Sequence, residues 1–233
     1  MGLHPSTEPV LIARELLGTA QVPGGEELKL YRHDRDFMIV LGHNELMSTR
    51  MNGSEIALAT QSCARIAHAK RPRLLIGGYG MGFTLRAALA DLGPDAQVTV
   101  AELVPEIVAW ARGPMAELMA GCLDDPRVEL VMADVADVIE ADRGCYDAIL
   151  LDVDNGPDGL VREDNNRIYS RRGLLAARAA LRPGGVLAVW SVAKDAAFAA
   201  RLTKAGFRVD EVGVRARSNG KGPMHVIWFA TPA

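Results

Sequence analysis

From residue 73 onward, short apolar runs alternate with longer stretches in which apolar residues recur every three or four positions. The first pattern is typical of buried strands and the second of amphipathic helices. We expect strands at residues 73–77, 97–101, 127–132, 146–151 and 185–190, and helices at residues 83–92, 105–119, 134–140, 170–181 and 194–205. Such alternation indicates a parallel sheet built by right-handed crossovers.

The last two apolar runs, residues 208–214 and 225–230, follow one another without a helix between them. The turn sequence SNGKGP at residues 218–223 joins them, which predicts an antiparallel hairpin at the end of the sheet. The predicted fold is α/β, a Rossmann-like seven-stranded and mostly parallel sheet with a C-terminal antiparallel hairpin. Rossmann-like methyltransferases and their relatives have this architecture, but a fold does not fix a function.

The N-terminal part of the chain has a different pattern. Apolar and polar residues alternate in short bursts over residues 27–50, which predicts two or three short antiparallel strands. Ser54 is expected to cap a helix over residues 55–69. We therefore expect a small N-terminal β region with a linking helix at residues 1–70, and a Rossmann-like catalytic domain at residues 71–233.

Composition narrows the possible partners. The 233 residues are 49% hydrophobic, enough for one large α/β core with a small extension. The 26 basic and 29 acidic residues leave a net charge of −3 and no polybasic footprint, so we expect no nucleic-acid partner. Neither a signal-peptide pattern nor a long uncharged apolar run occurs, so we expect a cytoplasmic protein with no membrane partner.

Metal and disulfide sites are not predicted. The three cysteines, Cys63, Cys122 and Cys145, show no C-x-x-C pairing, and the five histidines are scattered without metal-ligand spacing. His225 stands at the start of the last predicted strand, where it could approach a ligand. We interpret it as a structural histidine at a strand end.

A glycine-rich turn follows the first strand of the predicted parallel sheet. Its four glycines, Gly77, Gly78, Gly80 and Gly82, suit a sharp turn that brings backbone close to a ligand at a helix N-terminus. Glu102 ends the next strand, 24 residues after Gly78, where an acid can accept hydrogen bonds from both hydroxyls of a ribose. The third glycine of the G-x-G-x-x-G fingerprint is one residue too early, which disfavours NAD or FAD.

Two further strand ends carry polar side chains. Asp134 follows the third strand, where it can accept from an adenine amino group, cap the next helix, or do both. Asp152, Asp154 and Asn155 follow the fourth strand and can together bind an amine and accept its proton, although Asp154 and Asn155 also suit a simple turn. Tyr169 is a candidate lid residue over the substrate or, alternatively, an aromatic that seats the next helix.

Five segments together resemble the core of the spermidine synthase family, the polyamine aminopropyltransferases of the class I S-adenosylmethionine-dependent methyltransferase superfamily. They are LIGGYGMGFTLR (75–86), VAELVPEI (100–107), DPRVELVMAD (125–134), YDAILLD (146–152) and LRPGGVL (181–187). The resemblance implies transfer of an aminopropyl group from decarboxylated S-adenosylmethionine to the amine of putrescine, with release of methylthioadenosine.

The same resemblance assigns roles to residues. It implies that Glu102 holds the ribose and Asp134 the adenine, with Leu103 and Val135 beside them in the co-substrate site. Asp152 stands where the family has the acid that engages the reacting amines. Relatives with an N-terminal β region often dimerise, so the resemblance also implies a homodimer.

The chain departs from the family pattern in its glycine turn. The family usually has an aspartate there, which grips the ammonium of the decarboxylated co-substrate and repels the carboxylate of S-adenosylmethionine. This chain has Tyr79, Gly80 and Met81 instead, which predicts tolerance of intact S-adenosylmethionine. Asn155 replaces the usual second acid, and Ser54 and Glu55 stand where Tyr-His-Glu is usual.

The sequence therefore predicts a transferase that alkylates a small amine, with either S-adenosylmethionine or its decarboxylated form as co-substrate and no metal. The resemblance favours aminopropyl transfer, and the glycine turn favours methyl transfer. A non-catalytic S-adenosyl-ligand binder is the alternative from another class, opposed by the carboxylates at the reactive centre. A nicotinamide enzyme is a third option, opposed by the glycine spacing.

Overall fold

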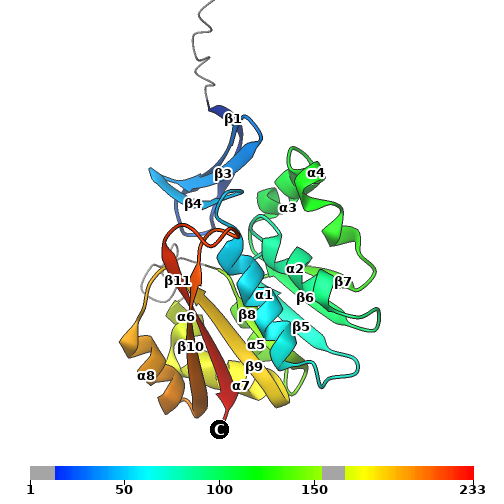
Figure 1. Cartoon of the computed structure of the whole chain (residues 1–233), viewed down its shortest axis with the longest axis vertical. Helices are drawn as coiled ribbons and strands as arrows, with labels where there is room; N and C mark the ends of the chain where they lie inside the picture. Colours follow the sequence, from blue (N-terminus) through cyan, green and yellow to red (C-terminus); the bar gives the residue numbers. More distant parts are fainter. Residues whose placement is uncertain (1–13, 154–165) are drawn as a thin grey trace, which may run out of the picture.

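The computed structural model describes residues 14–153 and 166–233, which form two sheets (Figure 1). The smaller sheet is antiparallel and follows chain order: β1 (Glu15–Gln21), β2 (Glu27–His33), β3 (Asp36–Leu41) and β4 (Asn44–Ser48). Three of its strands, β2 to β4, lie within residues 27–50 and confirm the two or three strands predicted there, and β1 is a fourth strand. The additional strand, β1, escaped prediction because its register with β2 shifts between Leu16 and Gly18, which breaks the two-residue alternation.

The larger sheet confirms the predicted seven-stranded topology. Its strands are β5 (Arg73–Gly77), β6 (Gln97–Glu102), β7 (Val128–Met132), β8 (Tyr146–Leu151), β9 (Leu181–Ser191), β10 (Phe207–Arg215) and β11 (Met224–Pro232). Their spatial order is β10-β11-β9-β8-β5-β6-β7. Strands β5 to β9 pair in parallel, and β11 runs antiparallel to both β9 and β10. The C-terminal hairpin is thus confirmed, while the domain division at residues 70 and 71 stays a prediction.

The helices are α1 (Gly53–Arg65), α2 (Phe83–Asp91), α3 (Pro105–Arg112), α4 (Ala116–Met119), α5 (Val135–Ala141), α6 (Asn166–Tyr169), α7 (Arg171–Ala180) and α8 (Ala196–Lys204), with a 3-10 turn, η1 (Cys122–Asp124). None of these described helices has both the length and the apolarity to cross a membrane.

Two helix predictions were wrong in detail. The helix expected at 105–119 is broken into α3 and α4, because Gly113 closes α3 and Pro114 has no N–H to continue it. The helix expected at 55–69 begins at Gly53 and ends at Arg65. Ser54 is not its cap, since Asn52 occupies that position without a side-chain hydrogen bond.

Apolar side chains cover both faces of the large sheet. Along β5, Leu74 and Ile76 pack with residues of α1 and α2, while Leu75 points to the opposite face, toward residues of α5 and α7. Every residue of β8 is buried, as expected for the central strand of a sheet with helices on both faces. The parallel strands are thereby held rigidly, so the positions of their carboxyl ends are well defined.

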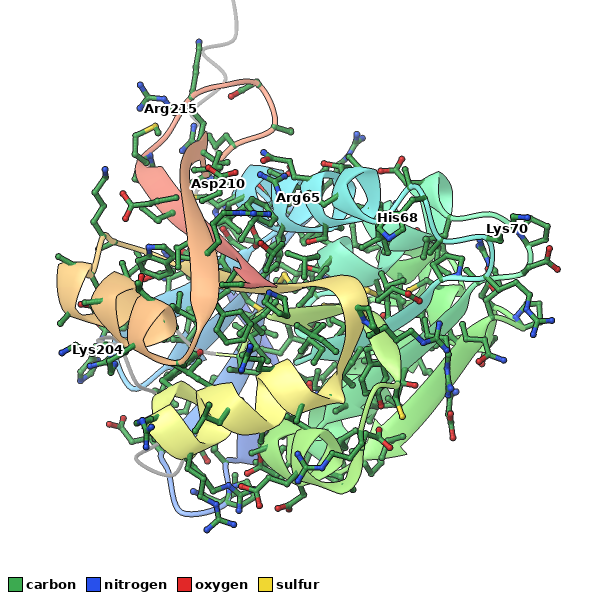
Figure 2. All side chains as sticks on the ribbon, turned by 90° about the horizontal axis from the view of Figure 1, so that it is seen from below. Arg65, His68, Lys70, Lys204, Asp210 and Arg215 are labelled. Carbon is green, nitrogen blue, oxygen red and sulfur yellow. The ribbon has the colours of Figure 1, made fainter. Side chains whose placement is uncertain are left out.

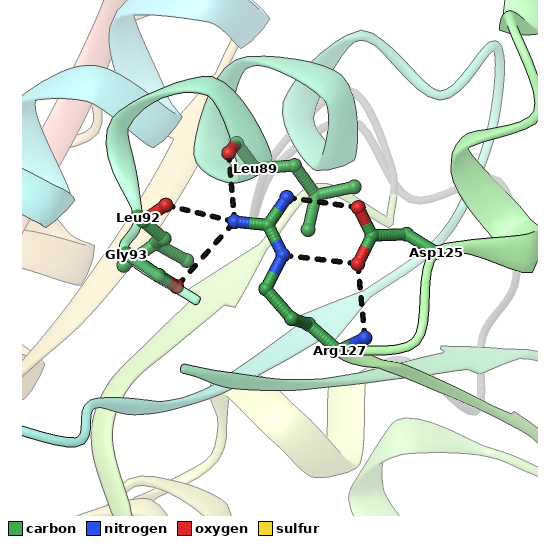
Figure 3. A network of polar contacts seen from close by, with 5 residues as sticks. All are labelled: Leu89, Leu92, Gly93, Asp125 and Arg127. Atoms are coloured by element: carbon green, nitrogen blue, oxygen red, sulfur yellow. Dashed lines mark hydrogen bonds and ion pairs between the residues drawn. The ribbon is translucent and has the colours of Figure 1, made fainter. Parts of the chain in front are cut away.

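Arg127 fastens one edge of this sheet to a neighbouring helix (Figure 3). Its guanidinium forms two hydrogen bonds with Asp125, of 2.9 and 2.8 Å. The same guanidinium donates to the carbonyl oxygens of Leu89, Leu92 and Gly93, at the end of α2. These last carbonyls of a helix lack partners within it, so one side chain satisfies them and ties α2 to β7.

Helix α1 is tied at both ends to the C-terminal hairpin. The Arg65 side chain pairs with Asp210 on β10 (Figure 2). Its guanidinium also lies 3.6 Å from the ring centre of Phe229. At the other end, the Gly53 N–H donates to the carbonyl of Ala216 over 2.8 Å. The hairpin therefore fixes the direction of α1, whose first turn carries Glu55.

Candidate active site

A pocket lies between the carboxyl ends of the parallel strands and the small sheet, which stands above them in Figure 1. The strand order reverses between β5 and β8, and open α/β sheets bind ligands at the crevice this creates. The polar lining comes from the glycine turn, from Glu102, Asp134 and Asp152 at strand ends, and from Glu55 on α1. Sidewalls of Leu28, Ile39 and Met47 come from the small sheet.

The glycine turn passes close to the end of β8. Gly78 has a φ of +83°, and a Cβ atom there would lie 2.5 Å from the carbonyl oxygen of Asp152. Gly78 and Gly80 line the pocket. Gly77 and Gly82 serve packing instead, because their missing Cβ atoms leave room for Val135 and Tyr79 respectively. Only half of the predicted glycine set thus faces the pocket.

Glu102 is buried and bound by backbone amides. Its Oε1 accepts from the N–H groups of Leu103 and Val104, each over 2.8 Å, and its Oε2 accepts from the N–H of Tyr79 over 2.9 Å. Burial raises the pKa of this carboxyl, and the amide hydrogen bonds partly offset the rise. The carboxylate therefore fixes the glycine turn to the end of β6, a structural role that sequence reasoning missed.

Asp134 caps α5, as one of its two predicted roles requires. Its Oδ1 accepts from the N–H of Ala136 over 2.8 Å. Asp134 also lines the pocket, together with Leu103 and Val135. One acidic and two apolar side chains thus line the pocket near the ends of β6 and β7.

Asp152 and Glu55 form a pair of carboxyl groups in the same pocket. Asp152 Oδ2 accepts from the Thr84 hydroxyl over 2.7 Å, and Glu55 Oε2 accepts from the Ser54 hydroxyl over 2.7 Å. Burial raises the pKa of both groups, and the neighbouring charge of Asp152 adds to the rise at Glu55. Two adjacent acids in a low-dielectric pocket disfavour double ionisation, so the pair tends to retain a proton.

A chain of polar contacts extends from Glu55 through Ser54 to His225, at the start of β11. Ser54 is fully buried, and its Oγ lies 2.9 Å from His225 Nδ1 as well as near Glu55. The His225 ring meets Trp190 edge to face at 4.9 Å, and burial lowers the pKa of His225, which favours its neutral form. Trp190 lines the pocket and is 8% exposed, and its indole N–H has no hydrogen-bond partner among the described residues.

The remaining predicted site residues are not brought into this pocket by the described structure. Tyr169 is buried on the other face of the sheet, where its ring packs edge to face on Phe198 at 5.6 Å. It immediately precedes Ser170, the N-cap of α7, so its position suits the helix-seating alternative rather than a lid. Asp154 and Asn155 lie outside the described residues.

The charge of the lining has one sign. Its carboxyl side chains are Glu45, Glu55, Glu102, Asp134 and Asp152, its other titratable side chains are Tyr79 and His225, and none of the described lining residues is lysine or arginine. Over residues 14–153 and 166–233, no cluster of three or more His, Cys, Asp or Glu side chains is arranged to hold a metal ion. The pocket therefore suits a cationic organic ligand that has an apolar body.

Known proteins that are similar to this chain include polyamine aminopropyltransferases. No protein-family model matches the chain. Polyamine aminopropyltransferase 2 of Pseudomonas aeruginosa is 35% identical over 130 residues, which are 54% of this chain and 35% of that protein. A polyamine aminopropyltransferase of Synechococcus is 30% identical over 117 residues, 50% of this chain and 36% of that protein. The matched segment thus spans about a third of the length of these relatives.

Solved structures extend the likeness to nearly the whole chain. Spermidine synthase from Thermotoga maritima aligns with a TM-score of 0.73 and 18% identity, over 94% of this chain and 73% of that one. A spermidine synthase in complex with the transition state analogue AdoDATO aligns with a TM-score of 0.75 at 18% identity, over 94% and 74%. Human methyltransferase-like protein 13 in complex with SAH gives 0.55 at 21% identity, over 78% and 80%. The chain therefore has the fold of spermidine synthases and is similar in sequence, over about half of its length, to polyamine aminopropyltransferases.

Proposed function

We propose that this chain is an aminopropyltransferase that uses decarboxylated S-adenosylmethionine to alkylate a small amine. One observation carries the proposal: Glu102, Asp134 and Asp152 end three strands of one sheet and line a single pocket with the glycine turn. The similarity to polyamine aminopropyltransferases supports the same chemistry.

The nucleoside half of the co-substrate binds along the ends of β6 and β7. Backbone amides already orient the Glu102 carboxylate. It accepts hydrogen bonds from the ribose hydroxyls, which also contact the glycine turn. Asp134 accepts from the adenine amino group while it caps α5, and Leu103 and Val135 flank the ring. Both carboxylates are hydrogen-bond acceptors held at fixed positions, so binding of the nucleoside requires little rearrangement of the pocket.

The reaction takes place beside Asp152. The lone pair of the acceptor amine attacks the methylene carbon bonded to the sulfonium, and the carbon–sulfur bond breaks with its electron pair going to sulfur. Methylthioadenosine leaves as a neutral thioether, and the amine gives its proton to Asp152, whose pKa is raised by burial toward the range useful for a base. Asp154 and Asn155 are proposed to hold the acceptor near this carboxylate. The sulfonium is already activated, so positioning is the main task of the protein.

Methyl transfer from intact S-adenosylmethionine is a second candidate. The observation that favours it is the glycine turn, where Tyr79, Gly80 and Met81 supply no acid to repel a co-substrate carboxylate. The two reactions differ in their nucleoside product, since methyl transfer releases S-adenosylhomocysteine and aminopropyl transfer releases methylthioadenosine.

The test is a product assay on the full chain. Decarboxylated S-adenosylmethionine is incubated with a panel of diamines and polyamines, and mass spectrometry detects amines that have gained one aminopropyl group. Asp152→Asn should reduce turnover by roughly 100-fold or more while methylthioadenosine still binds. Absence of product with every amine, or equal turnover by Asp152→Asn, would contradict the proposal, and binding without turnover would favour the non-catalytic alternative.

A cytoplasmic location and a homodimer belong to the same proposal, as does the absence of nucleic-acid and membrane partners. The homodimer rests on the resemblance to dimeric relatives with an N-terminal β region. Light scattering coupled to size-exclusion chromatography tests it, and a mass of one chain at micromolar concentration would contradict it.

A further inference from the structure

Glu55 and Asp152 reach one pocket from distant parts of the chain. Glu55 lies in the first turn of α1, and Asp152 directly follows β8. Each carboxyl group accepts from one hydroxyl at 2.7 Å, from Ser54 and Thr84 respectively, which fixes its orientation. Both side chains are partly buried, and neither has a lysine or arginine partner among the described residues. Carboxylates withdrawn from water are ordinarily paired with such cations.

The other titratable groups of the lining cannot neutralise this pair. Glu102 is bound to backbone amides, Asp134 caps α5, and Glu45 adds a further negative charge at the rim. His225 contacts Ser54, and burial lowers the pKa of its imidazole, which disfavours the cation. Among the described residues, therefore, no side chain supplies a charge that compensates the two carboxyl groups, and a cationic ligand would do so.

An independent observation on the same wall also points to a ligand. The indole N–H of Trp190 is buried and has no hydrogen-bond partner among the described residues, and Trp190 lines the pocket. Buried donors in native proteins nearly always have a partner. This wall of the pocket thus carries two carboxyl groups and an N–H donor unpaired among the described residues, and a bound molecule would give all three a partner.

We propose that Glu55 and Asp152 form a clamp for the ammonium group of the co-substrate, and that Glu55 thereby takes over the selection for the decarboxylated form from the acid that the glycine turn lacks. The inference rests on the proposed function and identifies the residue that decides between its two candidate reactions. It reverses the expectation, drawn from the glycine turn alone, that intact S-adenosylmethionine is tolerated.

The physical reason lies in the charges of the two co-substrates. The aminopropyl chain of the decarboxylated form ends in an ammonium, which relieves the repulsion between the two acids. Intact S-adenosylmethionine brings a carboxylate next to its ammonium, which adds a third negative charge where no described lining residue is cationic. Binding of the ammonium also drives off the proton that the pair retains, so binding should release a proton to the buffer.

Calorimetric titration of the full chain tests the proposal. The ligands are decarboxylated S-adenosylmethionine, S-adenosylmethionine and methylthioadenosine, which shares the nucleoside but has no ammonium. Each is titrated at one salt concentration in buffers of different ionisation enthalpy, which gives the number of protons released. Wild type is compared with Glu55→Gln and with Glu117→Gln, an exposed acid on α4 that serves as the matched charge control.

We expect wild type and Glu117→Gln to bind the decarboxylated form at least about tenfold more tightly than the intact form, with proton release. Glu55→Gln should lose most of this ratio and most of the proton release, yet bind methylthioadenosine as wild type does. An unchanged ratio in Glu55→Gln would overturn the clamp while leaving the proposed function standing. Failure of wild type to bind methylthioadenosine would instead overturn the proposed function itself.

Discussion

The carboxyl groups of the pocket differ in the hydrogen bonds that they accept from the rest of the protein. Glu102 accepts from three backbone N–H groups, whereas Glu55 and Asp152 each accept from a single hydroxyl. Backbone amides stabilise a carboxylate in the folded protein, while an adjacent acid destabilises it. Substitution of these acids should therefore change stability in opposite directions.

The Glu55 pair makes stability depend on pH. The pKa of Glu55 in the folded chain is raised above the ordinary value of 4.5. At a pH between these two values, the folded chain keeps a proton on Glu55 that the unfolded chain has lost. Stability is then full below pH 4.5 and falls as pH rises toward the raised pKa. Glu55→Gln has no carboxyl group to titrate at this position. Between about pH 5 and pH 8, the unfolding free energy of wild type should therefore fall by roughly 1 to 3 kcal/mol more than that of the variant. Urea titrations at several pH values measure it, and parallel curves for variant and wild type would contradict it.

Loss of the Glu102 carboxylate should cost stability. In Glu102→Gln the amide oxygen can still accept from Leu103 and Val104, but the amide NH₂ faces the N–H of Tyr79 and leaves a buried donor unpaired. The expected loss of unfolding free energy is about 2 to 3 kcal/mol. Denaturant unfolding measures it, with Glu129→Gln on the exposed face of β7 as a control expected within about 0.5 kcal/mol. A loss no larger than that of the control would count against this role of Glu102.

Sequence reasoning could find Glu102, Asp134 and Asp152 because each lies at or within two residues of the carboxyl end of a strand, and the carboxyl ends of parallel strands share one edge of the sheet. It gave Glu55 no site role and interpreted His225 as structural, because their meeting at Ser54 depends on a contact between residues 171 positions apart. Trp190 lies near the end of β9, a position at which the strand-end argument could have found it.

At the scale of elements, the position of α1 decides whether Glu55 reaches the pocket. Its C-terminal end is held by Arg65 against Asp210 and Phe229, and its N-terminal end by Gly53 against the loop after β10. A Cβ atom on Gly53 would lie 2.4 Å from the backbone carbon of Arg217, so a side chain there must displace one of the two elements. Glycine at this position is thus required by close approach of two backbones.

Gly53→Ala should therefore push the start of α1 away from the hairpin loop. We expect a loss of unfolding free energy of about 1 to 3 kcal/mol and a weaker preference for the decarboxylated co-substrate. Gly93→Ala is the matched control, because its new Cβ would meet nothing within 4 Å. Thermal or urea unfolding of both variants, with the calorimetric titration, measures the effects. Equal stability of the two variants would show that the contact at Gly53 does not constrain α1.

The element pattern was predictable where local periodicity and long-range packing agree, as in β5 to β8 and the C-terminal hairpin. It failed where a local irregularity interrupts the period, at the Gly113–Pro114 break and at the register shift in β1. Arg127 shows the limit of local reasoning, since three of its five guanidinium hydrogen bonds reach the end of α2, more than 30 residues away, and only the two to Asp125 are local.

At the scale of the whole molecule, the pocket belongs to both sheets. The large sheet supplies the acids at its strand ends, and the small sheet supplies apolar walls from β2, β3 and β4. The lining has five carboxyl groups and no described lysine or arginine, which suits an organic dication carried on a nucleoside. The molecule as a whole thus presents a negative, partly apolar pocket at the switch point of a spermidine synthase fold.

A competition between the two co-substrates distinguishes aminopropyl transfer from methyl transfer. The full chain is incubated with a diamine and equal concentrations of S-adenosylmethionine and its decarboxylated form, and mass spectrometry counts the two nucleoside products. We expect methylthioadenosine in clear excess, with the amine gaining one aminopropyl group. S-adenosylhomocysteine as the main product, with a methylated amine, would contradict it.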